Sequence, residues 1–348
     1  MNIGTITFHW ATNYGAVLQS YALQKYLFKL GYNVEIIDYC PGLIKFKQNI
    51  VALKSFNFCY FKQEKELKHF RKRYLHLSDK HYSSHRKLMN NHPDYDCIIA
   101  GSDQIWNESF TLRGEGKVTL SYFLDFAKVN TKRIAYAVSF GFHSPSKPYI
   151  EAVKEEIIKF SAISVRESDG VSIINSFGLP SCIVCDPTVL LAKEDYLEIA
   201  NRSTSSKKSV FAYILRNNQQ DAWKVACYVG KKYGLSIAEN RFIGSMEDWL
   251  YSIYSSEIVI TNSFHGIMLS LIMNKPFIAI TICGSGMNSR ITTLLNKVGL
   301  SSRVVDNFSE IEIENIINQK IDWVAVNQKI SELRLTGVVF LDQELNKQ

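Results

Sequence analysis

The stretch EIVITNSFHGIMLSLIMNKPFIAI, residues 257–280, indicates the fold more clearly than any other part of the sequence. An apolar run at 258–261 is followed by a polar turn with His265, an apolar helix that starts at Gly266 and a second strand that starts at Pro276. This order is typical of the βαβ unit of an open parallel sheet. Ligands bind such sheets at the carboxyl ends of the strands, where a helix N-terminus offers free N–H groups to an anion. We therefore expect His265 to stand where a reacting anion binds.

Alternating strands and helices extend along the chain in both directions from this stretch. A Ser- and Lys-rich segment at 194–209 separates a first alternation from a second one, and 348 residues are too many for one typical core. We predict an α/β protein of two Rossmann-like domains, residues 1–200 and 201–348, with a cleft that the carboxyl ends of both sheets line. The last helix, from about residue 322, is a candidate to pack back on the first domain.

The composition is that of an ordinary globular protein, with 46% hydrophobic residues. No run reaches the roughly 18 uncharged apolar residues of a spanning helix, and the chain opens with the strand-like NIGTITF. Seven cysteines scattered through apolar segments favour reduced thiols. We therefore expect a cytoplasmic protein. Peripheral attachment at the inner face of the membrane is the variant of this expectation that stays open.

A basic insertion near residues 42–92 interrupts the first alternation. Within it, residues 62–87 hold nine Lys and Arg against three acids, and 9 − 3 = +6 accounts for most of the net charge of +7. Leu67, Phe70, Tyr74 and Leu77 recur at helical spacing, so this segment is a candidate to lie on an anionic membrane surface. The alternative is a helix with a solvated basic face. Nucleic acid is not expected as a partner, because no stacking platform or known module is present.

Polar side chains follow the predicted strands at their carboxyl ends, and these are the candidate site residues. One acid, one histidine and one or two arginines suit a small dianionic substrate, because arginine binds carboxylate or phosphate in a bidentate fork while histidine and aspartate exchange protons. The candidates are Asn13, Tyr14, Gly15, Ser102, Asp103, Gln104, Arg166, Glu167, Asn262, Ser263, His265 and Arg290. Asp186, which precedes Pro187, is interpreted as a turn former. No metal site is expected from the spacing of His, Cys and carboxylates.

Five motifs taken together resemble the bacterial polysaccharide pyruvyl transferase family. They are NYGAVLQSYAL, AGSDQIWN, SVRE, DPTVLL and TNSFHG, and the resemblance covers roughly residues 4–300. It implies a glycosyltransferase-B-like pair of Rossmann-type domains. It also implies transfer of the pyruvyl group of phosphoenolpyruvate to a sugar of a cell-surface polysaccharide or of its lipid-linked precursor, with closure of a cyclic ketal. No cofactor is expected beyond this donor substrate.

The resemblance also implies roles for individual residues. His265 matches the histidine of the family's SFHG motif and is expected to act as acid and base toward the donor. Arg166 matches an arginine at the end of the VRE strand and is expected to hold the donor's anionic groups. Asp103 is the candidate base for the sugar hydroxyl. Either ligand could contact three amide side chains: Asn13, Gln19 and Gln104.

One position departs from the family pattern. Some pyruvyl transferases have an arginine two residues before the histidine, where this chain has Ser263, and Arg290 is the nearest replacement by sequence. Two alternatives therefore stay open at this point. One is a glycosyltransferase that uses a nucleotide-sugar donor, and the other is a non-catalytic member that binds a phosphorylated metabolite or a partner in glycan assembly.

Overall fold

The structure of the chain, a computed structural model, describes residues 1–92, 94–111, 118–141, 145–200, 208–215, 220–237, 242–281 and 288–347. The chain divides into two compact units. Unit 1 comprises Met1–Leu190 and Arg334–Gln348, and unit 2 comprises Leu191–Leu333. Part of the Ser- and Lys-rich segment from which a boundary near residue 200 was predicted, 201–207, lies outside the described residues.

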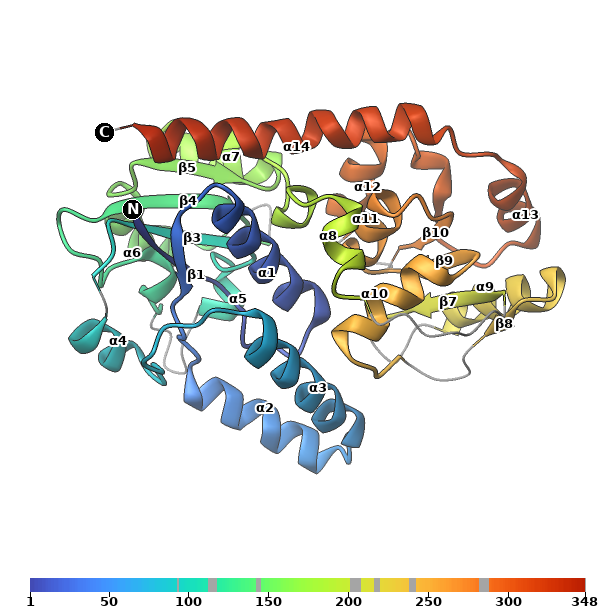
Figure 1. Cartoon of the computed structure of the whole chain (residues 1–348), viewed down its shortest axis with the longest axis horizontal. Coiled ribbons are helices and arrows are strands. Elements are labelled where there is room, and N and C mark those ends of the chain that lie inside the picture. Colours follow the sequence, from blue (N-terminus) through green and yellow to red (C-terminus); the bar gives the residue numbers. More distant parts are fainter. Residues whose placement is uncertain are drawn as a thin grey trace. The chain divides into compact units, whose positions relative to one another are not determined.

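Unit 1 is built on a parallel sheet that has, in the described residues, six strands in the order β2-β1-β3-β4-β5-β6 (Figure 1). These are β1 (Asn2–Ile6), β2 (Asn33–Ile36), β3 (Cys97–Asp103), β4 (Lys132–Val138), β5 (Ala162–Val165) and β6 (Cys182–Ile183). The strand order reverses between β1 and β3, because the chain moves outward from them in opposite directions. The carboxyl ends of these two strands therefore flank the point at which doubly wound sheets bind their ligands.

Helices cover both faces of this sheet. They are α1 (Tyr14–Lys29), α5 (Glu108–Thr111), α6 (Lys147–Ile157), α7 (Ser168–Asn175) and the short η1 (Ser121–Phe123) and η2 (Pro187–Val189). On one face α6 and α7 contribute Tyr149 and Ile174 to a buried cluster around Trp106. Because strand crossovers are right-handed, α1 lies on the opposite face. The polar residues at the carboxyl ends of these strands therefore lie between the helices of the two faces of the sheet.

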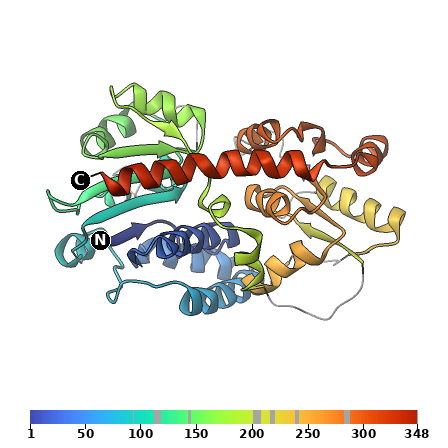
Figure 2. The ribbon, with the colours of Figure 1, turned by 45° about the horizontal axis from the view of Figure 1, so that its top comes forward.

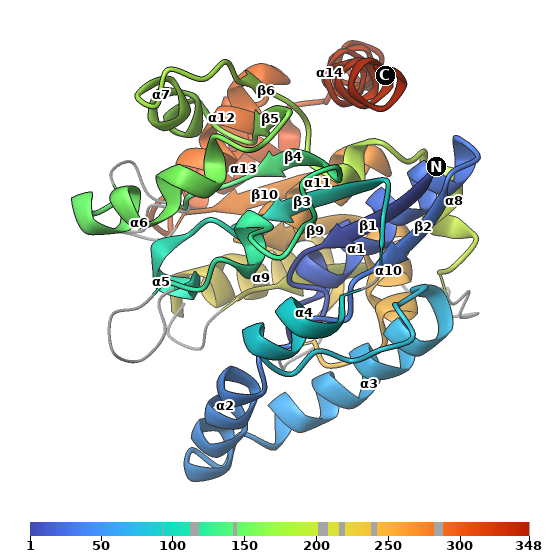
Figure 3. The same cartoon turned by 90° about the vertical axis from the view of Figure 1, so that its left-hand side faces the viewer.

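The insertion forms three helices, α2 (Gly42–Lys54), α3 (Phe58–Tyr74) and α4 (His85–Asn91). Figure 3 shows α2 and α3 extending away from the sheet. The apolar stripe of α3 packs inward on α1, where the Tyr21 ring lies 5.9 Å from that of Phe70, and Leu67 and Phe70 have no exposed surface. Leu67 and Phe70 are therefore core, whereas Leu77 lies past the end of α3 and pairs with Ile36 in an isolated bridge. The lysines of α3 remain exposed. Contact of residues 62–87 with a membrane stays a prediction.

Unit 2 contains a second parallel sheet, in the order β11-β10-β9-β7-β8. Its elements are α8 (Lys193–Leu197), β7 (Ser209–Tyr213), α9 (Gln220–Tyr233), β8 (Ser236–Ile237), α10 (Met246–Ser255), β9 (Ile258–Thr261), α11 (Phe264–Ile272), β10 (Phe277–Ile280), α12 (Asn288–Lys297), η3 (Ser301–Arg303), β11 (Val304–Val305) and α13 (Glu310–Asn318). The stretch 257–280 forms β9, α11 and β10, so the predicted βαβ unit is confirmed. The helix begins at Phe264, earlier than predicted, which places His265 in its first turn.

The last helix, α14 (Trp323–Asn346), is continuous, and its residues from Arg334 onward belong to unit 1 (Figure 2). There Thr336 Oγ1 accepts a 3.1 Å hydrogen bond from the Cys185 amide, and Arg334 Nε donates one of 2.7 Å to the Val189 carbonyl. These bonds fasten the helix to the segment that follows β6. In the part of the chain that the structure describes, no helix is long and apolar enough to cross a bilayer.

Candidate functional site

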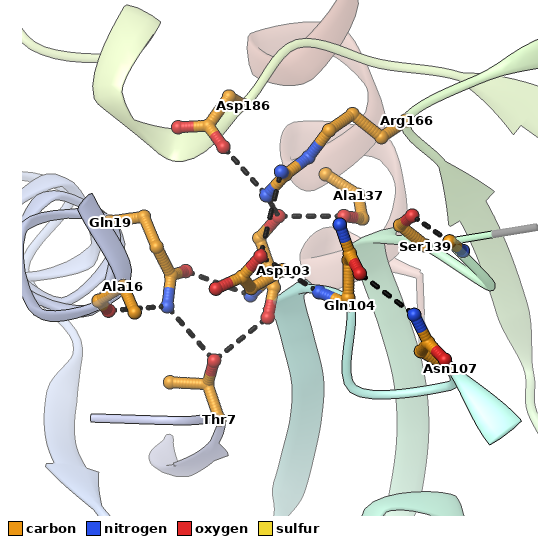
Figure 4. Close-up of polar contacts among 12 residues, drawn as sticks. Thr7, Ala16, Gln19, Asp103, Gln104, Asn107, Ala137, Ser139, Arg166 and Asp186 are labelled. Carbon is orange, nitrogen blue, oxygen red and sulfur yellow. Dashed lines mark hydrogen bonds and ion pairs between the residues drawn. The ribbon is translucent and has the colours of Figure 1, made fainter. Parts of the chain in front are cut away.

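A buried ion pair lies at the carboxyl edge of the unit 1 sheet (Figure 4). Nη2 of Arg166 lies 2.7 Å from Oδ2 of Asp186 and donates a hydrogen bond of 2.7 Å to Oγ of Ser102. Burial alone would lower the pKa of Arg166, but the charges of Asp186, Asp103 and Glu167 outweigh it and raise the pKa. The guanidinium therefore stays charged inside the protein, where its side chain is only 4% exposed.

Ser102 and Gln19 fix the end of β3 from the interior, and neither has exposed surface. The Ser102 amide donates to Oε1 of Gln19 at 3.1 Å, and its Oγ donates to the Ala137 carbonyl at 2.6 Å. Thr7 Oγ1 donates to the Ser102 carbonyl at 2.7 Å and accepts from Nε2 of Gln19 at 2.9 Å. These bonds tie α1, β1, β3 and β4 together, so both residues position the site. Their contact with a substrate stays a prediction.

Asp103 is the acid that this framework holds at the edge of the sheet. Its φ of +80° is in the left-handed region that non-glycine residues seldom adopt and that recurs at functional sites. Its Oδ1 accepts a 2.9 Å bond from the Gln104 amide and lies 3.7 Å from Nη1 of Arg166. The Asp103 side chain is 16% exposed, whereas that of Asp186 is fully buried. Of these two carboxylates, only that of Asp103 can meet a ligand.

Two further predicted residues stand beside Asp103 and are half-buried. Oε1 of Gln104 accepts a 2.8 Å bond from Asn107, and Glu167 accepts a hydrogen bond from the Ser139 hydroxyl. The structure thus brings together six predicted residues from α1, from the end of β3 and the residue after it, and from the two residues after β5. They are Gln19, Ser102, Asp103, Gln104, Arg166 and Glu167.

The predicted residues after β1 shape the start of α1. Asn13 is the N-cap, and its Oδ1 accepts a 3.0 Å bond from the Ala16 amide. Tyr14 and Gly15 form the first turn and are buried. Because capping occupies the Asn13 oxygen, these residues act structurally here. Their contact with a substrate stays a prediction.

In unit 2 the predicted residues gather where β9 ends and α11 begins. Asn262 accepts from the Leu215 amide at 2.7 Å and donates to the Leu215 carbonyl at 2.9 Å, so it clamps the backbone that follows β7. Ser263 is the N-cap of α11 and accepts from the Gly266 amide at 3.3 Å. A serine therefore stands at this position for a local reason, since its short side chain caps the helix that carries His265.

His265 and Arg290 both lie near the N-terminus of α11. His265 is 8% exposed, and its ring meets that of Phe264 edge-on at 5.4 Å. Cζ of Arg290, in α12, lies 5.9 Å from the centre of the Phe264 ring on the same first turn. A cation, an imidazole and the positive end of a helix form a set that suits an anion.

Sequence reasoning missed the role of Asp186. It does form a turn, as interpreted, because Oδ1 accepts from both the amide and the hydroxyl of Thr188 at 2.9 and 2.6 Å. Its Oδ2 is the partner of Arg166. The available signal was the apolar sequence on both sides of the DPT motif, since a carboxylate buried among apolar residues needs a partner. Within the described ranges, no three His, Cys, Asp or Glu side chains are placed to hold a metal ion.

Residues 13–284 match the family model described as polysaccharide pyruvyl transferase. The chain belongs to the polysaccharide pyruvyl transferase family. It is accordingly a transferase, and the family acts in polysaccharide biosynthesis. The matched range includes Asp103, Arg166 and His265, whereas Arg290 lies beyond it. No curated protein matches the chain significantly.

Two solved structures are similar in fold. UDP-GlcNAc 2-epimerase from Neisseria meningitidis, bound to UDP-GlcNAc, matches over 100% of both chains with 10% identity and a TM-score of 0.55. MnaA from S. aureus, with UDP, matches over 95% of this chain and 91% of its own, with 10% identity and a TM-score of 0.52. At this identity the likeness concerns the fold alone. It confirms the predicted class of two Rossmann-like, glycosyltransferase-B-like domains.

Proposed function

We propose that this transferase moves the pyruvyl group of phosphoenolpyruvate to a sugar of a polysaccharide or of its lipid-linked precursor and closes a cyclic ketal. The observation that supports this donor is the pairing of Arg290 with the first turn of α11, where His265 stands. Phosphoenolpyruvate carries a phosphate and a carboxylate, and a helix start with an arginine binds such groups. Arg290 thereby offers the cation that Ser263 does not supply.

The reaction requires one acid and one base. Protonation of the methylene carbon of the donor turns it into a methyl group and makes C2 electrophilic. A sugar hydroxyl then adds to C2 and gives its proton to a base. Phosphate leaves with the electrons of its C–O bond, and a second hydroxyl closes the ring with loss of its proton. The atoms balance as donor plus diol giving ketal plus inorganic phosphate.

We assign His265 as the acid and Asp103 as the base. The Asp103 carboxylate suits a base because it is partly exposed and held on a fixed backbone. Arg166 was expected to hold the donor directly, but its guanidinium is paired with Asp186 and Ser102. We therefore propose that Arg166 is a positioning residue that acts through Asp103. The predicted cleft between the two domains stays a prediction.

Calorimetric titration with phosphoenolpyruvate tests the donor without an acceptor. Saturable binding is expected, and Arg290→Ala should weaken it about 10- to 100-fold, the range for a charged contact to an anion. Lys297→Ala, at the exposed end of the same helix, is the matched control and should bind as the unmodified protein does. Absence of phosphoenolpyruvate binding, together with clear binding of a nucleotide sugar, would overturn the donor in favour of glycosyl transfer.

The roles of Asp103 and Arg166 need a turnover assay. Phosphate release from phosphoenolpyruvate in the presence of lipid-linked oligosaccharide is the readout. Asp103→Asn should lower kcat by about 10²- to 10⁴-fold and leave donor binding within a few-fold. Arg166→Lys keeps the positive charge but loses the planar guanidinium that contacts Asp186, Ser102 and Asp103. It leaves the Asp103 side chain in place, so it should shift the pH profile of kcat through its effect on Asp103. An unchanged profile would contradict a role of Arg166 through Asp103.

A further inference from the structure

Helix α2 has its apolar side chains on the outside. Leu43, Phe46 and Leu53 are spaced three and seven residues apart, on one stripe of the helix, and are 78%, 62% and 60% exposed. A surface helix normally turns such a stripe toward the core. The apolar stripe of α2 therefore faces away from the unit that carries it.

The orientation of α2 is fixed by polar contacts on its inner side. Lys45 Nζ lies 2.9 Å from Oε2 of Glu64 in α3 and donates to the Trp10 carbonyl at 3.3 Å. Asn49 accepts a 3.2 Å bond from the hydroxyl of Tyr60, also in α3. A rotation of α2 about its axis that buried the apolar stripe would break these contacts and leave the Glu64 carboxylate facing apolar side chains. The polar contacts therefore hold the apolar stripe on the outside.

The exposed apolar surface continues past the end of the helix. Phe56 lies in the turn to α3 with a φ of +52° and is 79% exposed, and Phe58 at the start of α3 is 71% exposed. We call these residues the α2 apolar surface: Leu43, Phe46, Leu53, Phe56 and Phe58. Exposed apolar side chains that gather in this way mark interaction sites.

The charges around the α2 apolar surface are of one sign. Seven basic side chains of α2 and α3 are exposed, namely Lys47, Lys54, Lys62, Lys65, Lys68, Lys72 and Arg73. Glu64 and Glu66, the acids of these two helices, are half-buried, and Glu64 is paired with Lys45 and Arg71. Among residues 42–74, all of which the structure describes, no acid is exposed. The surface therefore combines apolar side chains with a basic surround.

We propose that the α2 apolar surface binds an anionic lipid bilayer, with Phe and Leu side chains in the acyl boundary and lysines on the headgroups. An outward apolar stripe with basic flanks is the composition of helices that lie in the plane of a membrane interface. Lysine stems also lie along apolar surface while their ammonium groups stay in water. The occupant is thus the anionic lipid surface itself.

A second copy of this chain is the main competing occupant, and charge argues against it. Two copies that met through this surface would bring the same lysines together, because a two-fold interface sets a patch against itself. Like charges in an interface oppose association, whereas anionic headgroups attract the same residues.

The inference is independent of the donor proposed above, since it rests on α2 and α3 alone. The same segment does touch the loop that follows β1, because Lys45 also donates to Thr12 Oγ1 at 3.1 Å. Thr12 directly precedes the Asn13 cap of α1. Attachment through α2 would therefore hold the carboxyl edge of the unit 1 sheet near the membrane surface. The lipid-linked acceptor proposed above would be bound at that surface.

Vesicle sedimentation of the full chain tests the proposal. The protein should sediment with vesicles of phosphatidylcholine and phosphatidylglycerol, and much less with phosphatidylcholine alone or at high salt. Phe46→Gln/Leu53→Gln should lower the partition coefficient at least about 10-fold, because two large apolar side chains no longer enter the bilayer. Ile311→Gln/Leu335→Gln, two helical residues of unit 2 and α14 that are 77% and 58% exposed, is the matched control and should bind normally.

Three results would overturn the proposal. One is that the protein does not bind the anionic vesicles, and another is that Phe46→Gln/Leu53→Gln binds them as well as the control variant does. The third is a dimer in analytical ultracentrifugation that Phe46→Gln/Leu53→Gln dissociates, which would make a second copy the occupant. Thermal unfolding that matches the unmodified protein checks that the variants are folded. Calorimetric binding of phosphoenolpyruvate by the same preparations separates a failure here from a failure of the donor assignment.

Discussion

Arg166 and Asp186 form an ion pair, 2.7 Å from Nη2 to Oδ2, in which neither side chain is more than 4% exposed. The pair joins the residue after β5 to the turn after β6. Arg166 also donates a hydrogen bond to Ser102, which lies at the end of β3. The geometry of Asp103 therefore depends on two charges that lie behind it in the protein.

Removal of one charge from this pair should destabilise the protein strongly. Asp186→Asn leaves the Arg166 guanidinium buried without its anion, which costs about 3–5 kcal/mol. Urea denaturation followed by circular dichroism measures the change. Glu332→Gln is the control, because it removes an exposed pair with Lys329, and it should cost less than about 1 kcal/mol. Equal losses in the two variants would contradict a structural role for the buried pair.

Gly101 should tolerate no side chain. Its φ is +122°, and a Cβ there would overlap the carbonyl oxygen of Tyr136 on the neighbouring strand β4. Gly101→Ala should therefore sharply reduce the yield of folded protein. Gly178→Ala is the matched control, because Gly178 has a φ of +76° but nothing within 4 Å, and it should cost only about 1 kcal/mol of backbone strain. Thermal melting of both variants decides the point, and similar melting temperatures would refute the overlap.

Asn262 should stabilise unit 2 through both ends of its amide. Asn262→Ala leaves the amide and carbonyl of Leu215 without these bonds and should cost about 2 kcal/mol. Asn262→Asp should be no better, since a carboxylate can accept from the amide but cannot donate to the carbonyl. Chemical denaturation compares them with Asn318→Ala, an exposed residue at the end of α13, where little change is expected. A stable Asn262→Asp protein would argue against the clamp.

The stability of the protein should fall in acid partly through Asp38. Burial alone would raise the pKa of this carboxyl, but hydrogen bonds and attraction from His9 and His81, at 3.1 and 2.9 Å, hold the pKa below its ordinary value. A depressed folded pKa gives stability that is full above about pH 4 and is lost as the pH falls through the folded value. The difference in unfolding free energy between the unmodified protein and Asp38→Asn should therefore be largest near neutrality and shrink in acid. A difference that persists at low pH would contradict this.

Local patterns in the sequence were sufficient to predict much of the fold. The apolar run before Asn262 and the helical spacing after it gave β9 and α11, because both depend on neighbours in the chain. The helix began earlier than predicted because Ser263 caps it. The same reasoning found the stripe of Leu67 and Phe70, which is buried, but it could not show that α1 covers it.

Contacts between distant segments were not predictable from one sequence. Arg166 and Asp186 come from different strand ends, and only the fold shows that they meet. Helix α2 is the clearest case, because periodicity gives the apolar stripe of Leu43 and Phe46 but not its direction. The direction in which the stripe points is set by the ion pair between Lys45 of α2 and Glu64 of α3.

The division of α14 between the two units affects how the protein is made. Unit 1 is closed by Arg334–Gln348, which follow unit 2 in the sequence. On the ribosome, the first sheet emerges early but lacks the helix that bonds Cys185 and packs Phe340 on Tyr136 until synthesis reaches residue 340. At an elongation rate of about 5–20 residues per second this delay lasts many seconds, during which the surface that the end of α14 covers stays open to solvent.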